Sequence, residues 1–177
     1  SYLNYGLANG NFIGLGRANN FSAELYIEES FPERLHQLRQ YQSLPQGQRG
    51  QFLKTLPFSD FRQQVWYTQP KQAGKFTWIE IYNWVDNPEI IVIGSGQPFY
   101  NAQGKFLGVV EVDLFLANIQ DYLRSLQVTP HSQVFVIEKN GKVVATSSQH
   151  PPFKLKEKNA ERILITQFPD PLIQAAG

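Results

Sequence analysis

Two Asn-Gly pairs, each set between short apolar runs, constrain the fold of this chain more than any other feature. The first is Asn9-Gly10, which separates Tyr2–Leu7 from Phe12–Arg17, and the second is Asn140-Gly141, just ahead of Val143–Thr146. The central residues of a tight hairpin need positive φ, which asparagine and glycine adopt at little cost. The sequence therefore predicts a β-hairpin near each end of the chain.

Runs with strand-like patterns fill much of the space between the hairpins. Within residues 77–85 strict alternation would place Trp78, Tyr82 and Trp84 on one face of a strand. Residues 89–94 form a continuous apolar run, which is typical of a buried central strand. Further strands are predicted for residues 23–28 and 105–114, the latter after a turn at 101–104. The fold class is therefore α+β, built on an antiparallel sheet with few helices.

Helical periodicity is confined to a few segments. Residues 35–44 fit a helix or a strand equally well, and residues 60–73 predict a helix interrupted by Pro70. Leucine and isoleucine recur on one helical face of residues 116–126, so this segment predicts an amphipathic helix that links the sheet to the second hairpin. Asp170 before Pro171 has the residue types that begin a helix.

Composition excludes several classes of function. Sixteen Lys and Arg balance fifteen Asp and Glu for a net charge of +1, whereas nucleic-acid binding needs a basic surplus. The chain has no cysteine and no apolar run of membrane-spanning length. Its three histidines, His36, His131 and His150, lie far apart in sequence, and no nucleophile–base motif is present. We therefore expect no catalytic residues, no metal site and no cofactor in this segment.

Aromatic residues are dense between positions 61 and 84. Trp and Tyr combine an apolar body with a polar tip, which suits the wall of a small-molecule pocket. Composition alone favours the alternative, in which these residues pack in the core or cover a sheet face. The face with Trp78, Tyr82 and Trp84 also carries Glu80, and the opposite face is aliphatic and makes the better core. The aromatic face therefore needs a covering or a ligand.

Two carboxylates stand out near the end of a predicted strand. Glu111 and Asp113 are two residues apart, so they point to the same face. Asp113 could hold a ligand amine or guanidinium, or it could cap the following helix. For Glu111 we expect solvent exposure.

The order of these segments resembles the double Cache sensor domain. The resemblance rests on Trp66-Tyr67, on the run Thr77-Trp-Ile-Glu-Ile-Tyr-Asn-Trp, on Gln97-Pro-Phe-Tyr, and on Gly108-Val-Val-Glu-Val-Asp-Leu. It covers most of the chain and is greatest for cyanobacterial versions in sensor histidine kinases and nucleotide cyclases.

The resemblance implies two PAS-like modules in tandem outside the cytoplasmic membrane. Residues 1–115 would form the membrane-distal module, 116–129 the linking helix, and 130–177 part of a truncated membrane-proximal module. A long helix would precede Ser1, so we expect an excised piece of a membrane receptor, attached to the membrane through flanking helices. The full receptor would be a homodimer with a cytoplasmic output domain, such as a histidine kinase or a nucleotide cyclase.

The resemblance also implies a ligand pocket in the distal module. In the amino-acid-binding branch an Arg two positions before the Trp-Tyr pair grips the ligand carboxylate; here that residue is Gln64, and Trp84 replaces a usual Asp. We therefore expect a neutral, aromatic or cationic small molecule rather than a typical α-amino acid. A module that binds no ligand and acts as a spacer or docking domain is the alternative. The candidate ligand-binding residues are Gln64, Trp66, Tyr67, Trp78, Tyr82, Trp84, Ser95 and Asp113.

Overall fold

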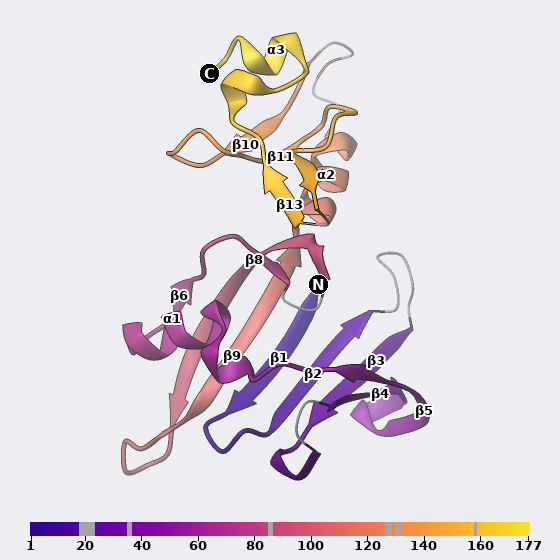
Figure 1. The fold of residues 1–177 in the computed structure, drawn as a ribbon, viewed down its shortest axis with the longest axis vertical. Coiled ribbons are helices and arrows are strands. Elements are labelled where there is room, and N and C mark those ends of the chain that lie inside the picture. Colours follow the sequence, from indigo (N-terminus) through magenta and orange to yellow (C-terminus); the bar gives the residue numbers. More distant parts are fainter. Residues whose placement is uncertain (18–23, 35–36, 85–86, 127–128, 130–131, 158) are drawn as a thin grey trace.

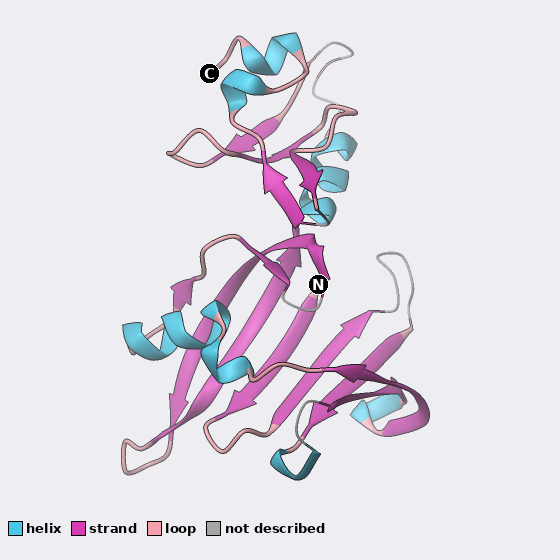
Figure 2. Cartoon of the chain, in the orientation of Figure 1, coloured by secondary structure: helices cyan, strands magenta, loops and turns pink. Residues whose placement is uncertain are grey.

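A curved antiparallel sheet dominates the lower part of the molecule, and two small hairpins with short helices form the upper part (Figures 1 and 2). The computed structural model describes residues 1–17, 24–34, 37–84, 87–126, 129, 132–157 and 159–177. The strands of the large sheet follow the order β5-β4-β3-β2-β1-β9-β8-β6, with β7 also paired to β8. No helix among the described residues is long and apolar enough to cross a membrane.

The first predicted hairpin is confirmed. Strands β1 (Tyr2–Leu7) and β2 (Phe12–Arg17) pair antiparallel, and Gly10 takes a φ of 96° in the turn between them. The Asn9 side chain accepts a hydrogen bond from the backbone amide of Asn11 at 3.0 Å, which supports the turn. Strand β1 also pairs with β9 (Phe106–Phe115), so the hairpin is built into the middle of the sheet.

The sheet is completed on one side by β3 (Leu25–Ser30), β4 (Gln37–Ser43) and β5 (Arg49–Pro57). Strand β3 begins two residues later than predicted, and residue 23 lies outside the described residues. Of the ambiguous segment 35–44, residues 37–43 form the strand β4, because β3 and β5 pair with it on either side. Residues 35–36 lie outside the described residues.

The predicted continuous strand over residues 77–85 is wrong. Two short strands form instead, β6 (Thr77–Trp78) and β7 (Tyr82–Trp84), both paired with the long strand β8 (Asn87–Tyr100). Four residue steps separate Trp78 from Tyr82, but three separate their partners on β8, Ser95 and Val92. The extra residue reverses the side to which the chain points, so Trp78 does not share a face with Tyr82.

Helix α1 (Val65–Ala73) lies across the inner face of the sheet over β8 and β9 (Figure 1). The predicted interruption at Pro70 is wrong, because the helix continues through it. Pro70 is buried against Gly96 of β8, where a Cβ atom would collide with the proline ring. The core between helix and sheet contains Tyr2, Phe12, Leu38, Phe61, Trp66, Tyr67, Ile79 and Val109.

The upper part begins with α2 (Leu116–Ser125), which is the amphipathic helix that the sequence predicts. The second hairpin is also confirmed, as β10 (Phe135–Ile137) and β11 (Val143–Thr146). A further pair, β12 (Phe153–Lys156) and β13 (Asn159–Arg162), precedes α3 (Pro171–Gln174), whose first turn is capped by the Asp170 carboxylate.

The two parts are joined by a small apolar cluster. Ile91 of β8 packs with Leu116 of α2, Val144 of β11 and Ala160 of β13. The Asn83 side chain adds a hydrogen bond of 2.9 Å to the Ala160 carbonyl.

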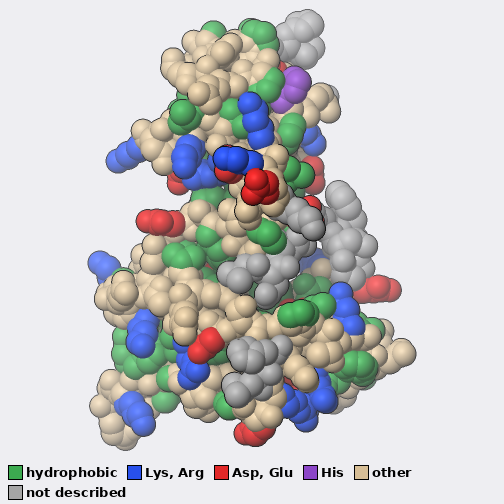
Figure 3. Space-filling view, in the orientation of Figure 1, with side chains coloured by type: hydrophobic (Ala, Val, Ile, Leu, Met, Phe, Trp, Pro, Cys, Tyr) green, Lys and Arg blue, Asp and Glu red, His purple; other side chains and the backbone are tan. Residues whose placement is uncertain are grey.

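Acidic and basic side chains are interspersed over the face of the molecule seen in Figure 3.

Candidate ligand-binding site

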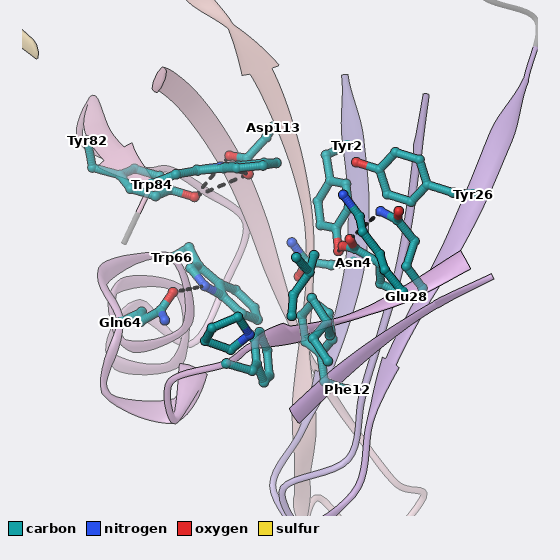
Figure 4. Close-up of a pocket in the computed structure, with 16 residues that line it drawn as sticks. Tyr2, Asn4, Phe12, Tyr26, Glu28, Gln64, Trp66, Tyr82, Trp84 and Asp113 are labelled. Carbon is teal, nitrogen blue, oxygen red and sulfur yellow. Dashed lines mark hydrogen bonds between the residues drawn. The ribbon is translucent and has the colours of Figure 1, made fainter. Parts of the chain in front are cut away.

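A cavity of about 410 Å³ lies between the inner face of the large sheet, helix α1 and the segment around β7. Figure 4 shows Trp66 and Gln64 approaching from α1 and its N-terminus, Tyr82 and Trp84 from β7, and the remaining labelled residues from the sheet. The volume is within the range of small-molecule pockets. The lining residues are Tyr2, Asn4, Phe12, Tyr26, Glu28, Leu38, Gln40, Lys54, Leu56, Pro57, Phe58, Gln64, Trp66, Tyr82, Trp84 and Asp113.

Five of the eight candidate residues meet at this cavity. They come from distant parts of the chain, and they are Gln64, Trp66, Tyr82, Trp84 and Asp113. The Trp66 indole Nε1 donates a 2.8 Å hydrogen bond to Gln64 Oε1, which fixes the edge of this ring. Trp84 packs edge-on against Tyr2, with 5.4 Å between ring centroids. Aromatic faces therefore form much of the wall.

The other three candidate residues do not line the cavity. Tyr67 is buried in the core behind Trp66, because it lies on the side of α1 that packs onto Phe61 and Phe106. Trp78 is 62% exposed, as the extra residue between β6 and β7 turns it outward. Ser95 follows the inward-facing Gly94 on β8 and points to the opposite face of the sheet.

Asp113 forms the acidic end of the cavity. The residue is 2% exposed, and its carboxyl group accepts hydrogen bonds from Trp84 Nε1 at 3.1 Å and from the Tyr82 hydroxyl at 3.0 Å. It does not cap α2, whose N-cap is Phe115. Both donors sit on β7, so this short strand orients the carboxyl toward the cavity (Figure 4).

The expectation that Glu111 is exposed is wrong. Glu111 shares the inner face of β9 with Asp113, as predicted, but it is 1% exposed because α1 and β7 cover this face. Asn4 Nδ2 donates to Glu111 Oε2 at 2.6 Å, and the Tyr82 hydroxyl lies 3.1 Å from Glu111 Oε1. Two carboxyl groups are therefore buried side by side.

Burial dominates the electrostatics of this pair. Removal from water raises the pKa of Glu111 well above its usual range, and the adjacent Asp113 charge raises it further. Burial also raises the pKa of Asp113, although the hydrogen bonds that it accepts from Trp84 and Tyr82 oppose this shift. The pKa of the Tyr82 phenol is raised by burial and by both carboxyl groups, so Tyr82 remains a neutral donor.

A third carboxyl, that of Glu28, lines the opposite wall of the cavity (Figure 4). The Tyr2 hydroxyl donates to Glu28 Oε2 at 2.6 Å, and Gln40 Nε2 donates to Oε1 at 2.8 Å. Burial and the Glu28 charge raise the pKa of Tyr2 well above its usual value. Lys54 is the basic residue among those that line the cavity, and it lies on an exposed stretch of β5.

Sequence reasoning missed the contribution of the first three strands to the site. Tyr2, Asn4, Tyr26 and Glu28 all face the cavity. A usable signal was present, because Asn4 and Glu28 each follow an aromatic residue, Tyr2 and Tyr26, two positions earlier on the same strand face. Polar residues on the inward face of a strand need partners or a ligand.

Comparison with known protein families identifies a sensor domain. Residues 17–121, more than half of the chain, match the model of the methyl-accepting chemotaxis protein-like first PDC sensor domain. No curated protein sequence matches the chain at a significant level.

Solved structures with a similar fold include the ligand-binding domain of Mlp24 with asparagine. The TM-score is 0.51 at 18% identity, over 95% of this chain and 52% of that chain. The extracellular domains of the putative histidine kinases mmHK1S-Z2 and mmHK1S-Z3 give TM-scores of 0.45 and 0.48 at 21% and 14% identity. Each alignment covers 78% of this chain, with 46% of the first and 45% of the second covered. The chain thus spans about half the length of the solved structures that it matches.

Proposed function

Because the chain belongs to the family of methyl-accepting chemotaxis protein-like first PDC sensor domains, we propose that its cavity binds a small organic cation with an ammonium group and an apolar body. The observation that carries this proposal is the buried Asp113 carboxyl, which faces a chamber walled by Trp66, Trp84 and Tyr2. A carboxylate attracts an ammonium group, and aromatic faces attract cations and apolar groups alike.

The charge of the cavity disfavours ligands with a carboxylate. Among the described lining residues two acids, Asp113 and Glu28, outnumber one lysine, Lys54. Gln64 can donate hydrogen bonds but brings no positive charge. Arginine would offer a charged, bidentate clamp for a carboxylate, and no arginine is among the described residues that line the cavity. An amine without a carboxylate therefore fits better than an α-amino acid.

The signalling role is part of the same proposal. The sensor would lie outside the cytoplasmic membrane, in a receptor that dimerises and carries a histidine kinase or nucleotide cyclase output domain. Residues 1–115 would be the distal module, 116–129 the link and 130–177 part of the proximal module. Ligand binding shifts an equilibrium between two packings only if it binds one of them better. Helix α2 is the natural transmitter, since it follows directly on the strand that carries Asp113.

The exposed apolar residues on the outer face of the large sheet favour the long helix that the family resemblance implies ahead of Ser1. Tyr5, Ile13, Val112 and Leu114 lie on this face and are between 38% and 49% exposed. An apolar sheet face of this kind is usually covered. A chain extended by its natural upstream residues is expected to bind less of a hydrophobic dye than this chain does.

A thermal and fluorescence titration tests the ligand proposal. In a Trp78→Phe chain the remaining tryptophans, Trp66 and Trp84, both line the cavity, so their emission reports on it directly. We expect 2-phenylethylammonium to change the emission and raise Tm, with about 2.7 kcal/mol of stabilisation at roughly 100 times its Kd. The neutral isostere 2-phenylethanol is the matched control.

The spacer alternative makes the opposite prediction. If the cavity serves only packing, amines and neutral isosteres of graded size will leave both emission and Tm unchanged. Equal effects of 2-phenylethylammonium and 2-phenylethanol would contradict the role of the carboxyl group while leaving an apolar pocket.

A further inference from the structure

The Glu111–Asp113 pair has a hydrogen-bonding arrangement that requires a proton. Both side chains are buried, and the Tyr82 hydroxyl lies 3.1 Å from Glu111 Oε1 and 3.0 Å from Asp113 Oδ1. A hydroxyl has one proton and can donate it to only one of these oxygens, and an ionised carboxylate cannot donate at all, so the second contact is a hydrogen bond only if one of the two carboxyl groups carries a proton. The contacts of the pair, from Asn4, Tyr82 and Trp84, come from neutral donors. None of them supplies the positive charge that two buried carboxylates would need.

The net charge around the pair remains negative when the groups that face it from neighbouring elements are included. Strand β1 contributes Asn4 and Tyr2, β7 contributes Tyr82 and Trp84, and β8 contributes Gly94, which has no side chain. Among the described residues, no lysine or arginine forms an ion pair with either carboxyl. The α-amino group of Ser1 acts on Asp113 from a distance, and Glu28 lies across the cavity.

Asn4 supplies a second, independent sign that something can bind here. Its Nδ2 atom is used by Glu111, but its Oδ1 atom is buried and has no hydrogen-bond partner among the described residues. The residue is 3% exposed and lines the cavity beside Asp113 (Figure 4). A buried unpaired acceptor is costly, and an ammonium N–H would satisfy it.

From this arrangement we infer that Glu111 and Asp113 share one proton in the ligand-free protein and that a bound ammonium group replaces that proton. The exchange is balanced: one ammonium enters, one proton leaves Glu111 for solvent, and the net charge of the pair and its partner stays the same. The ammonium then donates its N–H groups to Asp113 and to Asn4 Oδ1, which line the cavity, while the ionised Glu111 keeps its contacts with Asn4 Nδ2 and the Tyr82 hydroxyl. This inference rests on the proposed function and adds to it that the affinity for the ammonium ligand increases as pH rises.

The first arm of the test needs no ligand. The carboxyl carbons of ¹³C-labelled Glu and Asp are followed by NMR as a function of pH, and the Glu111 signal is assigned as the one lost in Glu111→Gln. We expect the Glu111 carbon to keep its protonated shift near neutral pH. If both carboxyl carbons have the chemical shifts of ionised carboxylates at that pH, the pair does not share a proton and the inference is wrong.

The second arm measures how many protons are released when 2-phenylethylammonium binds, by titration calorimetry in two buffers of different ionisation enthalpy. We expect about one proton released per ammonium bound, and a Kd that falls about tenfold for each unit of rising pH below the pKa of the pair. In Glu111→Gln, which cannot carry the proton, release is expected to vanish and Kd to become nearly independent of pH. An N-terminally acetylated chain separates this effect from titration of the Ser1 amine.

The outcomes distinguish the two proposals. Binding without proton release, and with a Kd that is constant over pH, overturns the exchange but leaves the proposed ammonium pocket standing. Failure of 2-phenylethylammonium to bind contradicts the ammonium pocket and the exchange together, while the NMR arm still decides whether the proton is shared.

Discussion

The backbone of Gly94 lies so close to the Glu111 carboxyl that a Cβ atom at this position would be 2.5 Å from Glu111 Oε1. The same Cβ would be 3.1 Å from Asp113 Oδ1, because Asp113 is the residue of β9 that pairs with Gly94 of β8. Glycine at this position therefore makes the space in which two carboxyl groups can sit together.

Gly94→Ala is expected to destabilise the fold and disturb the carboxyl pair. Overpacking of this kind costs about 1–3 kcal/mol, which urea unfolding will measure. Ser95→Ala, one residue further and on the opposite face of β8, is the matched control and should change stability little. Unchanged stability in Gly94→Ala would show that the carboxyl groups can move aside freely.

Asp113→Asn tests the ligand contact while keeping the shape of the side chain. Loss of a charge-assisted hydrogen bond should weaken binding of 2-phenylethylammonium by about 1.5–3 kcal/mol, or roughly ten- to hundredfold in Kd. The Tm should change little, because one of two crowded carboxyl groups is removed. A large fall in Tm with unchanged Kd would show that Asp113 is a structural residue.

The raised pKa of Glu111 predicts the pH dependence of stability. A carboxyl whose pKa is higher in the folded than in the unfolded state, where it is about 4.3, stabilises the fold at low pH. That contribution is lost as pH rises through the folded-state value. Thermal melts from about pH 5 to about pH 8 should therefore show that the Tm of Glu111→Gln increases relative to the Tm of the natural chain as pH rises.

The exposed Glu80 provides the control for this titration. Glu80→Gln removes one carboxyl group from an exposed position and so controls for the change in net charge. A constant Tm difference between Glu111→Gln and the natural chain would contradict the raised pKa.

Gln64→Arg should shift selectivity toward α-amino acids. The natural chain should prefer 2-phenylethylammonium to L-phenylalanine, which differs from it by one carboxylate, and an arginine at position 64 should reverse this preference. Gln64→Leu controls for loss of the hydrogen bond to Trp66. Unchanged selectivity in Gln64→Arg would place residue 64 away from the carboxylate end of the ligand.

Local signals predicted the parts of the fold that local physics decides. The Asn9-Gly10 turn formed because the positive φ and the side-chain hydrogen bond are properties of those few residues. The α2 helix formed where the apolar period changes, and Asp170 caps α3 as its position suggests. Strand β4 was undecided because its conformation depends on pairing with β3 and β5 rather than on its own residues.

The errors arose where tertiary contacts decide. Alternation showed that Glu111 and Asp113 share a face, but the choice of the inner face depends on where α1 and β7 pack. Trp78 left the predicted face because one extra residue lies between β6 and β7, which periodicity cannot reveal. Of the site, the residues near α1, β7 and β9 were predicted, whereas Asn4 and Glu28 required knowledge of the sheet order.

A crystal structure of the chain with 2-phenylethylammonium tests the central claim most directly. The account predicts density for one molecule inside the cavity, with its nitrogen within hydrogen-bonding distance of the Asp113 carboxylate and its ring against Trp66 or Trp84. A cavity that contains only water at saturating ligand, or a ligand whose nitrogen points away from Asp113, would contradict it.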